Sequence, residues 1–323
     1  MSTYRFWSGL EYLEMPREQP AWLVEPLLSP GALMNIYGAP KAGKSRLGLG
    51  LAIAISTGEE KWLDKYVIHT PGPVLWLEAD NSPPEWLQVL RDVAQEGHDI
   101  SNIHFADRDW IPYPFDLLDE DAGHDEVLHD MIQAHVEAGW PPPVLIVIDT
   151  IREAHSGDEN DSTAMRNVIT RLQAVTYPAA LLLISHSRKG GGLQAINGEG
   201  DDHDGRVMEE NRGSNYLVGK MQTVVRVTTN RQRTHGFFTA EGRSIGQERF
   251  RMRQSSPSYL WHPDADPAHE LAKTLAESNP DWSERRIARE LAQIMKLEEE
   301  KARSIVRRTL KAGRTATTSG HMS

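Results

Sequence analysis

The chain has 323 residues, no cysteine and a formal net charge of −11. This length accommodates a large α/β core and one small appended domain, because single domains seldom exceed about 250 to 300 residues. The lack of cysteine excludes a disulfide framework and thiolate metal sites, and the acidic charge confines any nucleic-acid contact to local basic patches or a central channel. Charged residues interrupt the N-terminus early and no apolar run reaches the length of a membrane span, so we expect a cytoplasmic protein with no membrane partner.

A phosphate-binding pattern lies between the first predicted strand and the first predicted helix. Residues 38–45 read Gly-Ala-Pro-Lys-Ala-Gly-Lys-Ser, which matches G-x-x-x-x-G-K-[ST] in a strand, loop, helix context. The glycines let the backbone curl so that its N–H groups point at phosphates. Lys44 supplies a charge for the β- and γ-phosphates and the Ser45 hydroxyl can ligate Mg²⁺, so the pattern predicts binding of ATP or GTP. The expected nucleotide contacts are Gly38, Ala39, Pro40, Lys41, Ala42, Gly43, Lys44, Ser45 and Arg46.

Strands and helices alternate along the next 150 residues. The hydrophobic pattern predicts strands at 34–37, 74–77, 103–105, 144–148 and 180–185, and helices at 46–57, 84–96, 124–138 and 161–174. Nearly unbroken apolar strands that alternate with helices are typical of a mostly parallel sheet covered on both faces. Two further β-rich stretches, 221–228 and 234–239, fit antiparallel strands that extend this sheet.

Polar side chains follow three of these strands. The strand at 144–148 delivers Asp149 in the form of a Walker B strand, and we expect this carboxylate to hold Mg²⁺ directly or through water. The second strand ends in Glu78 and Asp80, and either could orient the attacking water; alternation can put both on one face, so periodicity does not choose between them. His186 can contact the γ-phosphate or relay its loss, or it is a hydrogen-bonded residue at the end of its strand.

The segment 190–211 is rich in glycine and acidic residues and is predicted to be a mobile loop. Its acidic stretch, 198–210, is a poor contact for DNA because phosphates repel it. Arg188 and Lys189, at the base of the loop, are the better candidates for DNA contacts.

The order of these motifs resembles a known group, the RecA-fold P-loop ATPases, and within it the RepA-like (AAA_25-type) branch of plasmid and phage hexameric replicative helicases. The resemblance covers residues 20–240 and rests on 38–45, 72–80, 144–150, 184–190 and the Arg-Gly-Ser at 212–214. It implies a RecA-like core over 1–262, the cofactors ATP and Mg²⁺, and a homo-oligomeric ring, expected to be a hexamer, on single-stranded DNA.

Further site residues follow from the resemblance. The family's catalytic glutamate falls on Glu78 or Asp80: alignment through Ala79 favours Asp80, whereas chemistry favours the longer Glu78. Arg212 corresponds to the arginine that reaches the ATP of the neighbouring subunit, and the alternative is a surface salt-bridge arginine. The catalytic set implied is Lys44, Glu78, Asp80, Asp149, His186 and Arg212. The chain departs from its relatives in the acidic loop and in Gly219-Lys220, where they often carry an acidic residue and an Asn.

After a Pro- and Asp-rich linker, residues 263–314 are predicted to form a helical module, with helices at 267–278, 283–295 and 297–311, followed by a disordered tail at 315–323. Two short helices, the second rich in arginine, resemble a helix-turn-helix or winged-helix unit. Residues 281–314 contain ten Lys and Arg against six Asp and Glu, a local charge of +4. The expected DNA-facing set is Lys301, Arg303, Arg307, Arg308, Lys311 and Arg314; the alternative is a solvated bundle that docks on a partner protein or adjacent subunit.

The leading hypothesis is a Mg²⁺- and ATP-dependent helicase that acts on single-stranded DNA in plasmid or phage replication. Three alternatives stay open: a RecA-like recombination or strand-annealing ATPase, an ATP-switched DNA-binding initiator or helicase loader, and a signalling ATPase that does not contact nucleic acid. Replication or recombination proteins are the partners that these hypotheses imply.

Overall fold

The computed structural model describes residues 8–14, 21–106, 124–155, 157, 161–186, 219–230, 232–264 and 267–318. The chain divides into two compact units. The first comprises Met1–Arg249 and Gln254–His262, and the second comprises Phe250–Arg253 and Pro263–Ser323. Among the described residues, none of the helices combines the length and hydropathy of a membrane-spanning segment.

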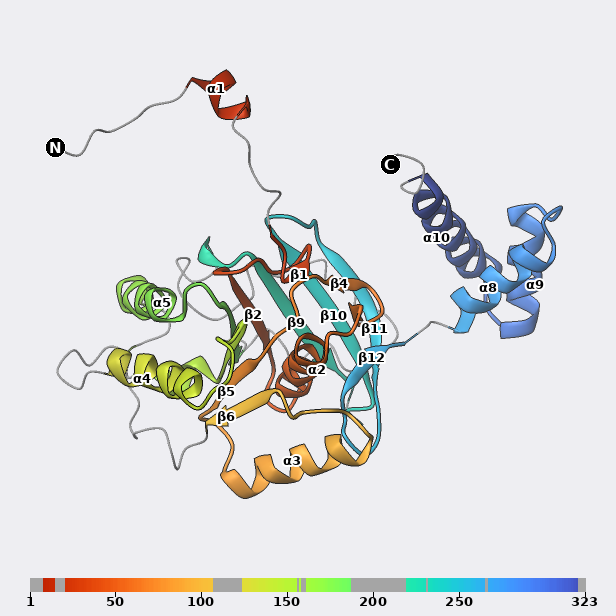
Figure 1. Cartoon of the computed structure of the whole chain (residues 1–323). Coiled ribbons are helices and arrows are strands. Elements are labelled where there is room, and N and C mark those ends of the chain that lie inside the picture. Colours follow the sequence, from red (N-terminus) through yellow and green to blue (C-terminus); the bar gives the residue numbers. More distant parts are fainter. Residues whose placement is uncertain are drawn as a thin grey trace. The chain divides into compact units, whose positions relative to one another are not determined.

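A nine-stranded sheet organises the chain, in the order β12-β11-β10-β9-β2-β8-β7-β5-β6 (Figure 1). Neighbouring strands from β9 to β6 in this order pair in parallel, and β10 pairs antiparallel with β9. A largely parallel sheet is therefore confirmed, although the stretch at 221–228, expected to be antiparallel, extends the parallel part. The strands are β2 (Leu33–Gly38), β5 (Val74–Glu78), β6 (Ile103–Ala106), β7 (Leu145–Asp149), β8 (Ala180–His186), β9 (Thr223–Thr229), β10 (His235–Gly242), β11 (Glu248–Gln254) and β12 (Trp261–Pro263).

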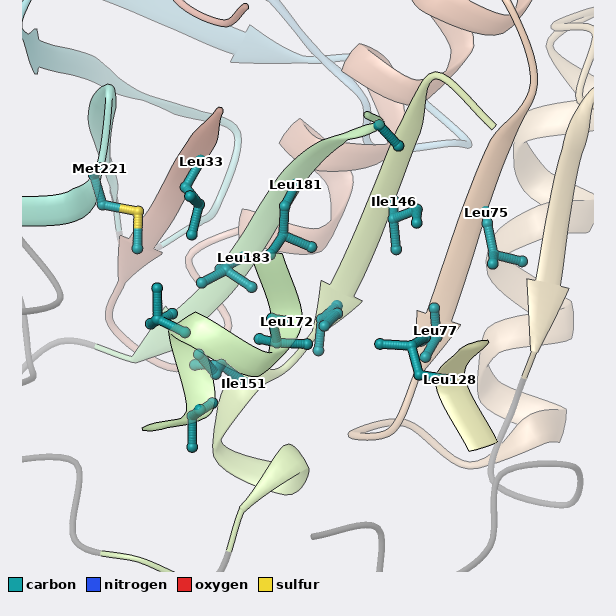
Figure 2. Close-up of a cluster of buried hydrophobic side chains, with 14 of the residues drawn as sticks. Leu33, Leu75, Leu77, Leu128, Ile146, Ile151, Leu172, Leu181, Leu183 and Met221 are labelled. Atoms are coloured by element: carbon teal, nitrogen blue, oxygen red, sulfur yellow. The ribbon is translucent and has the colours of Figure 1, made fainter. Parts of the chain in front are cut away.

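Helices cover both faces of the parallel part of the sheet, and alternate residues of β8 show how. Leu181 and Leu183 join a buried cluster with residues of α5 (Ser162–Thr176), α4 (His124–Glu137) and neighbouring strands (Figure 2). Leu182 and Ile184 face α2 (Lys44–Thr57), which packs so closely that a Cβ added at Gly48 would lie 3.1 Å from Ile184 Cδ1. On the α2 side, Trp86 of α3 (Pro83–Gln95) stacks on Trp76 of β5. The parallel strands thus lie between two helical layers.

Several small elements escape the sequence pattern. A three-stranded sheet of β1 (Val24–Glu25), β4 (Tyr66–Ile68) and β3 (Lys61–Trp62) has strands too short for a periodicity. Its Trp62 and Tyr66 pack on Phe238 of β10, with ring centroids 5.8 and 5.7 Å away. The helix α1 (Gly9–Glu14), the 3₁₀ turn η1 (Ile151–Ala154) and the strands β11 and β12 were also not predicted.

The second unit contains three helices, α8 (Pro267–Ser278), α9 (Glu284–Met295) and α10 (Glu299–Thr318). The Ser283 side chain caps α9 by accepting a hydrogen bond from Arg286 N, and Lys296 in the left-handed region (φ 52°) ends it. Apolar residues from all three helices form one small core: Ala268, Ala272, Ile287, Ala288, Leu291, Ala302 and Val306. Within residues 267–318 no strand accompanies the helices, so a wing is not supported there, and the helix-turn-helix stays a prediction.

The last helix is longer than predicted. It continues past residue 311 to Thr318, so residues 315–318, expected to be disordered, are helical. No proline interrupts this stretch, and the single glycine, Gly313, costs a helix only about 1 kcal/mol relative to alanine.

Candidate nucleotide-binding site

The phosphate loop joins β2 to α2, and each glycine of its motif has a steric reason. A Cβ at Gly38 would lie 2.5 Å from the carbonyl oxygen of Val227 on the neighbouring strand β9. Gly43 precedes the first residue of α2 with φ +85°, a conformation that side-chain-bearing residues rarely adopt. The loop therefore brings the N-terminal end of α2, with its unpaired N–H groups, to the carboxyl edge of the sheet, which is a favourable place for phosphate.

Lys44 is a buried cation at this edge, with 6% of its surface exposed. Its Nζ donates a hydrogen bond to the Ala39 carbonyl at 3.2 Å and lies 3.2 Å from His186 Nδ1. Burial lowers the pKa of Lys44, while Asp149 and Asp80 act in the opposite direction. The predicted residue at the end of β8, His186, is thus in contact with the predicted phosphate-binding lysine.

Asp149 ends β7 with a buried carboxylate that is 1% exposed. Among the residues that the structure describes, neither of its carboxylate oxygens has a well-aligned hydrogen-bond partner. Burial raises the pKa of Asp149, whereas the Ser45 hydroxyl and Lys44 oppose this shift. The Asp149–Thr150 peptide bond is cis.

A divalent cation fits this environment. A buried carboxylate without well-aligned hydrogen bonds is costly unless something compensates its charge, and carboxylate and hydroxyl oxygens are the ligands that Mg²⁺ prefers. Within the part of the chain that the structure describes, no cluster of three or more acidic or histidine side chains could hold a metal alone. Mg²⁺ in nucleotide sites commonly takes one or two protein ligands and completes its shell with phosphates and water, so Ser45 and Asp149 suit it.

The two candidate catalytic carboxylates lie in different environments. Glu78 lies opposite Asp149 in the β5–β7 register and is fully buried. Its Oε1 accepts hydrogen bonds from Asn81 N (2.8 Å), Asn81 Nδ2 (2.9 Å) and Asp80 N (3.2 Å), and its Oε2 accepts from Trp76 Nε1 (3.3 Å). Burial, and then the nearby Asp149, raise the pKa of Glu78, which the hydrogen bonds only partly offset.

Asp80, by contrast, is exposed. The backbone N–H groups of Ala79 and Asp80 donate to the Asp149 carbonyl at 2.7 and 3.2 Å, which ties the tip of β5 to the end of β7. The Asp80 charge acts on both Lys44 and Asp149. Of the two candidates, Asp80 is therefore the one that solvent reaches, and Glu78 is held inside the turn that carries it.

Two contributors to this site were not predicted. Asn81 holds Glu78 with both its backbone and side-chain N–H groups, and an Asn before Ser-Pro-Pro is a turn signal that could have indicated it. Trp261 of β12, 218 residues away in sequence, donates its indole N–H to the Gly43 carbonyl at 2.9 Å. Nothing in the sequence pattern connects Trp261 with the phosphate loop.

The predicted DNA contacts are described only in part. Arg188, Lys189 and the arginine-finger candidate Arg212 lie outside the described residues, as does the acidic stretch 198–210. On α10, Lys301, Arg303 and Arg307 are exposed, and Arg303 donates to Glu299 Oε1 at 2.7 Å. The side chains of Arg308, Lys311 and Arg314 lie outside the described part.

A phosphate loop between β2 and α2, with a buried lysine at the start of α2 and a Walker B aspartate at the end of β7, which β8 separates from β2, defines a P-loop ATPase core. A family model described as an AAA domain, AAA_25, matches residues 6–192, which is more than half of the chain. The chain therefore belongs to the AAA_25 family of P-loop ATPases, which includes RepA-like helicases. The match ends before Arg212 and before β9 to β12. No curated protein matches the chain significantly.

Proposed function

We propose that this P-loop ATPase is a Mg²⁺-dependent, ring-forming motor of the RepA-like helicase type that acts on single-stranded DNA. The observation that carries the nucleotide part is the buried carboxylate of Asp149, without a well-aligned hydrogen bond, near the buried Lys44 at the phosphate loop. Buried charges of this kind persist where a ligand compensates them, and a Mg²⁺-nucleotide supplies both the cation and the phosphates.

The residues of the site would have separate roles in hydrolysis. Lys44 binds the β- and γ-phosphate oxygens in place of its present partners, Ala39 and His186. Ser45 and Asp149 hold Mg²⁺, which would neutralise charge that develops on the phosphates. Asp80 orients a water and accepts its proton as the water oxygen bonds to the γ-phosphorus and the bond to the β,γ-bridging oxygen breaks, leaving ADP and phosphate. Glu78 fixes the backbone of Asp80 and so sets where its carboxylate lies.

His186 is placed to couple the loss of the γ-phosphate to a conformational change. When the γ-phosphate leaves, Lys44 regains its contact with His186, which ends β8 four residues before the segment 190–211 that is predicted to be mobile. A change at this contact is suited to shifting the segment that follows. The resemblance further implies that Arg212 acts on the ATP of a neighbouring copy, so hydrolysis would require assembly.

A second function, an ATP-switched DNA-binding initiator or loader, is favoured by one observation. The helical unit has its own hydrophobic core, and α9 and α10 are joined by the three residues 296–298, as in a helix-turn-helix. A recombination or strand-annealing ATPase shares the same nucleotide site and differs in what it does to DNA.

The decisive experiment is steady-state ATP hydrolysis with and without single-stranded DNA at two protein concentrations. Wild type is compared with Lys44→Ala, which removes the phosphate-binding charge, and with Arg212→Ala. DNA stimulation that rises with protein concentration and is lost in Arg212→Ala supports the ring motor. Tight ATP binding with slow turnover that DNA does not change supports the initiator or loader, and strand pairing without directional unwinding supports the recombination ATPase.

A further inference from the structure

The hairpin formed by β11 and β12 touches the phosphate loop directly. Trp261 is 4% exposed, and its Nε1 donates a hydrogen bond to the Gly43 carbonyl oxygen at 2.9 Å. That oxygen also accepts the first hydrogen bond of α2, from Leu47 N at 3.0 Å. The indole therefore binds the loop at the residue immediately before Lys44.

The contact leaves no space for adjustment. A Cβ placed on Gly43 would lie 2.6 Å from Trp261 Nε1 and 2.9 Å from Gln254 Nε2. Glycine is therefore needed at position 43 for two reasons: the backbone has a positive φ, and the neighbouring side chains leave no room for a Cβ. The hairpin supplies both of these side chains.

This hydrogen bond has a consequence for phosphate binding. The Gly43 carbonyl and the Lys44 N–H belong to one planar peptide group, in which C=O and N–H point in opposite directions. Holding the carbonyl on one side fixes the direction of the Lys44 N–H on the other. The N–H groups at this end of a phosphate loop are the ones that bind phosphate oxygens.

The hairpin that carries Trp261 is itself anchored. The Glu96 carboxylate, directly after α3, accepts hydrogen bonds from Ser255 Oγ (3.1 Å), Ser258 N (3.3 Å) and Ser258 Oγ. Ser258 is fully buried. Because α3 begins next to the Glu78–Asn81 turn, the same helix borders the acidic tip at one end and the hairpin at the other.

We propose that Trp261 is a positioning residue of the nucleotide site, which orients the Gly43–Lys44 peptide so that its N–H faces the phosphates. This role rests on the nucleotide binding of the proposed function and extends it to a strand outside the family match at 6–192. In sequence, β12 is the last strand before α8.

The test is Trp261→Phe, which keeps an aromatic ring and removes the N–H donor. Trp86→Phe is the matched control, because Trp86 is similarly buried at 3% exposed and its indole nitrogen has no hydrogen-bond partner within the described ranges. The readouts are the Kd for Mg²⁺-ADP, the KM and kcat for ATP, and the thermal stability of the nucleotide-free protein.

We expect Trp261→Phe to raise Kd and KM by about three- to tenfold, the range that one hydrogen bond contributes, with kcat within about twofold. The phosphate-binding N–H stabilises the bound substrate and the transition state equally. Its loss therefore lowers the affinity for nucleotide and leaves kcat nearly unchanged. Trp86→Phe should leave Kd unchanged. Glu96→Gln, which weakens the anchor of the hairpin without touching the loop, should raise Kd in the same direction by a smaller factor.

Equal Kd values for wild type and Trp261→Phe would overturn the proposal, as would a loss of thermal stability without a change in Kd. If wild type itself binds no Mg²⁺-nucleotide, the proposed function fails first, and the two failures are distinguished. Should Trp261→Phe fold poorly, Glu96→Gln decides, since an unchanged Kd in that variant overturns the role of the hairpin.

Discussion

The carboxyl edge of the sheet and the helical unit handle charge in opposite ways. At the edge, Lys44, Glu78 and Asp149 are at most 6% exposed, and the charge of Asp149 acts on both of the others. On α10, Lys301 and Arg307 are exposed, and the ion pair between Arg303 and Glu299 lies at the surface with side chains 46% and 50% exposed.

This difference in the burial of charged side chains determines what each region indicates about function. Burying a charge is costly, so a group of buried charges is retained where a ligand compensates it. Exposed charges cost little, and surface ion pairs contribute about 0 to 1 kcal/mol, so a basic helix is compatible with DNA, with a partner protein or with solvent alone. The buried charges therefore point to a ligand, whereas the charges of α10 do not by themselves select one.

The largest effect is expected from Asp80→Asn. Removing the charge of the exposed carboxylate should lower kcat for ATP by about 10²-fold or more, the scale of a lost general base. Stability should change little, because the side chain is exposed. Steady-state hydrolysis and thermal unfolding measure both effects, and Asp64→Asn, another exposed aspartate, is the control. A wild-type kcat in Asp80→Asn would return the catalytic role to Glu78.

A substitution in the core of the helical unit is expected to have an effect of similar size, but on the free energy of unfolding and not on catalysis. Leu291 is fully buried in the core shared by α8, α9 and α10. Leu291→Ala should lower the free energy of unfolding of this unit by about 2 to 5 kcal/mol through lost burial and a residual cavity. Because the unit has its own core, ATP hydrolysis without DNA should persist. Loss of ATP hydrolysis together with the helices, followed by circular dichroism and enzyme assay, would contradict independent folding.

The fold was largely predictable because its core elements are long and periodic. Each of the five parallel strands from 34–37 to 180–185 ends within one residue of its prediction. These strands are buried on both faces, so hydrophobicity alone marks them. The strands β1, β3, β4 and β12 are only two or three residues long, which is too short to show a hydrophobic period. Their structure depends instead on packing against residues distant in sequence, as Trp62 of β3 packs on Phe238.

A smaller, graded effect should appear in the pH dependence of stability. Burial raises the pKa of Glu78 from its ordinary value of 4.5 to about 8. The native state then binds this proton more tightly than the unfolded chain does, so the group's contribution to stability is complete below pH 4.5 and is lost as the pH rises toward 8. Without nucleotide, we expect a loss of about 1 kcal/mol per pH unit in this window.

Urea unfolding between pH 5.5 and 8 measures this slope, and Glu78→Gln, which cannot titrate, should reduce it by the share of Glu78, while the raised pKa of Asp149 leaves a slope of the same sign. Glu60→Gln, at an exposed position, is the control and should leave the slope as in wild type. Identical slopes in wild type and Glu78→Gln would show that Glu78 does not carry a raised pKa in the folded protein.

The site was predictable where one motif carries the chemistry and not where the fold brings distant segments together. Lys44 and Asp149 follow from local patterns, whereas periodicity left Glu78 and Asp80 open. Their difference in burial arises from the hydrogen bonds that Asn81 and Trp76 make to Glu78. Trp261 could not be predicted at all, because its contact with the loop depends on the pairing order of a nine-stranded sheet.

The smallest expected effect tests whether the surface charges of α10 meet DNA. If they do, Lys301→Gln and Arg307→Gln should each weaken DNA binding a few-fold, regardless of sequence, and reduce the salt dependence by about one counterion. Glu299→Gln should act oppositely, because Glu299 pairs with Arg303 and adds a negative charge that phosphates would avoid. Glu277→Gln, at an exposed acidic position on α8, controls for net charge.

Titration of DNA at several salt concentrations separates these cases. Weaker DNA binding in Lys301→Gln, tighter binding in Glu299→Gln and unchanged binding in Glu277→Gln would locate the DNA on α10. Equal responses to both glutamate substitutions would reduce the effect to overall charge and favour a protein partner for the helical unit.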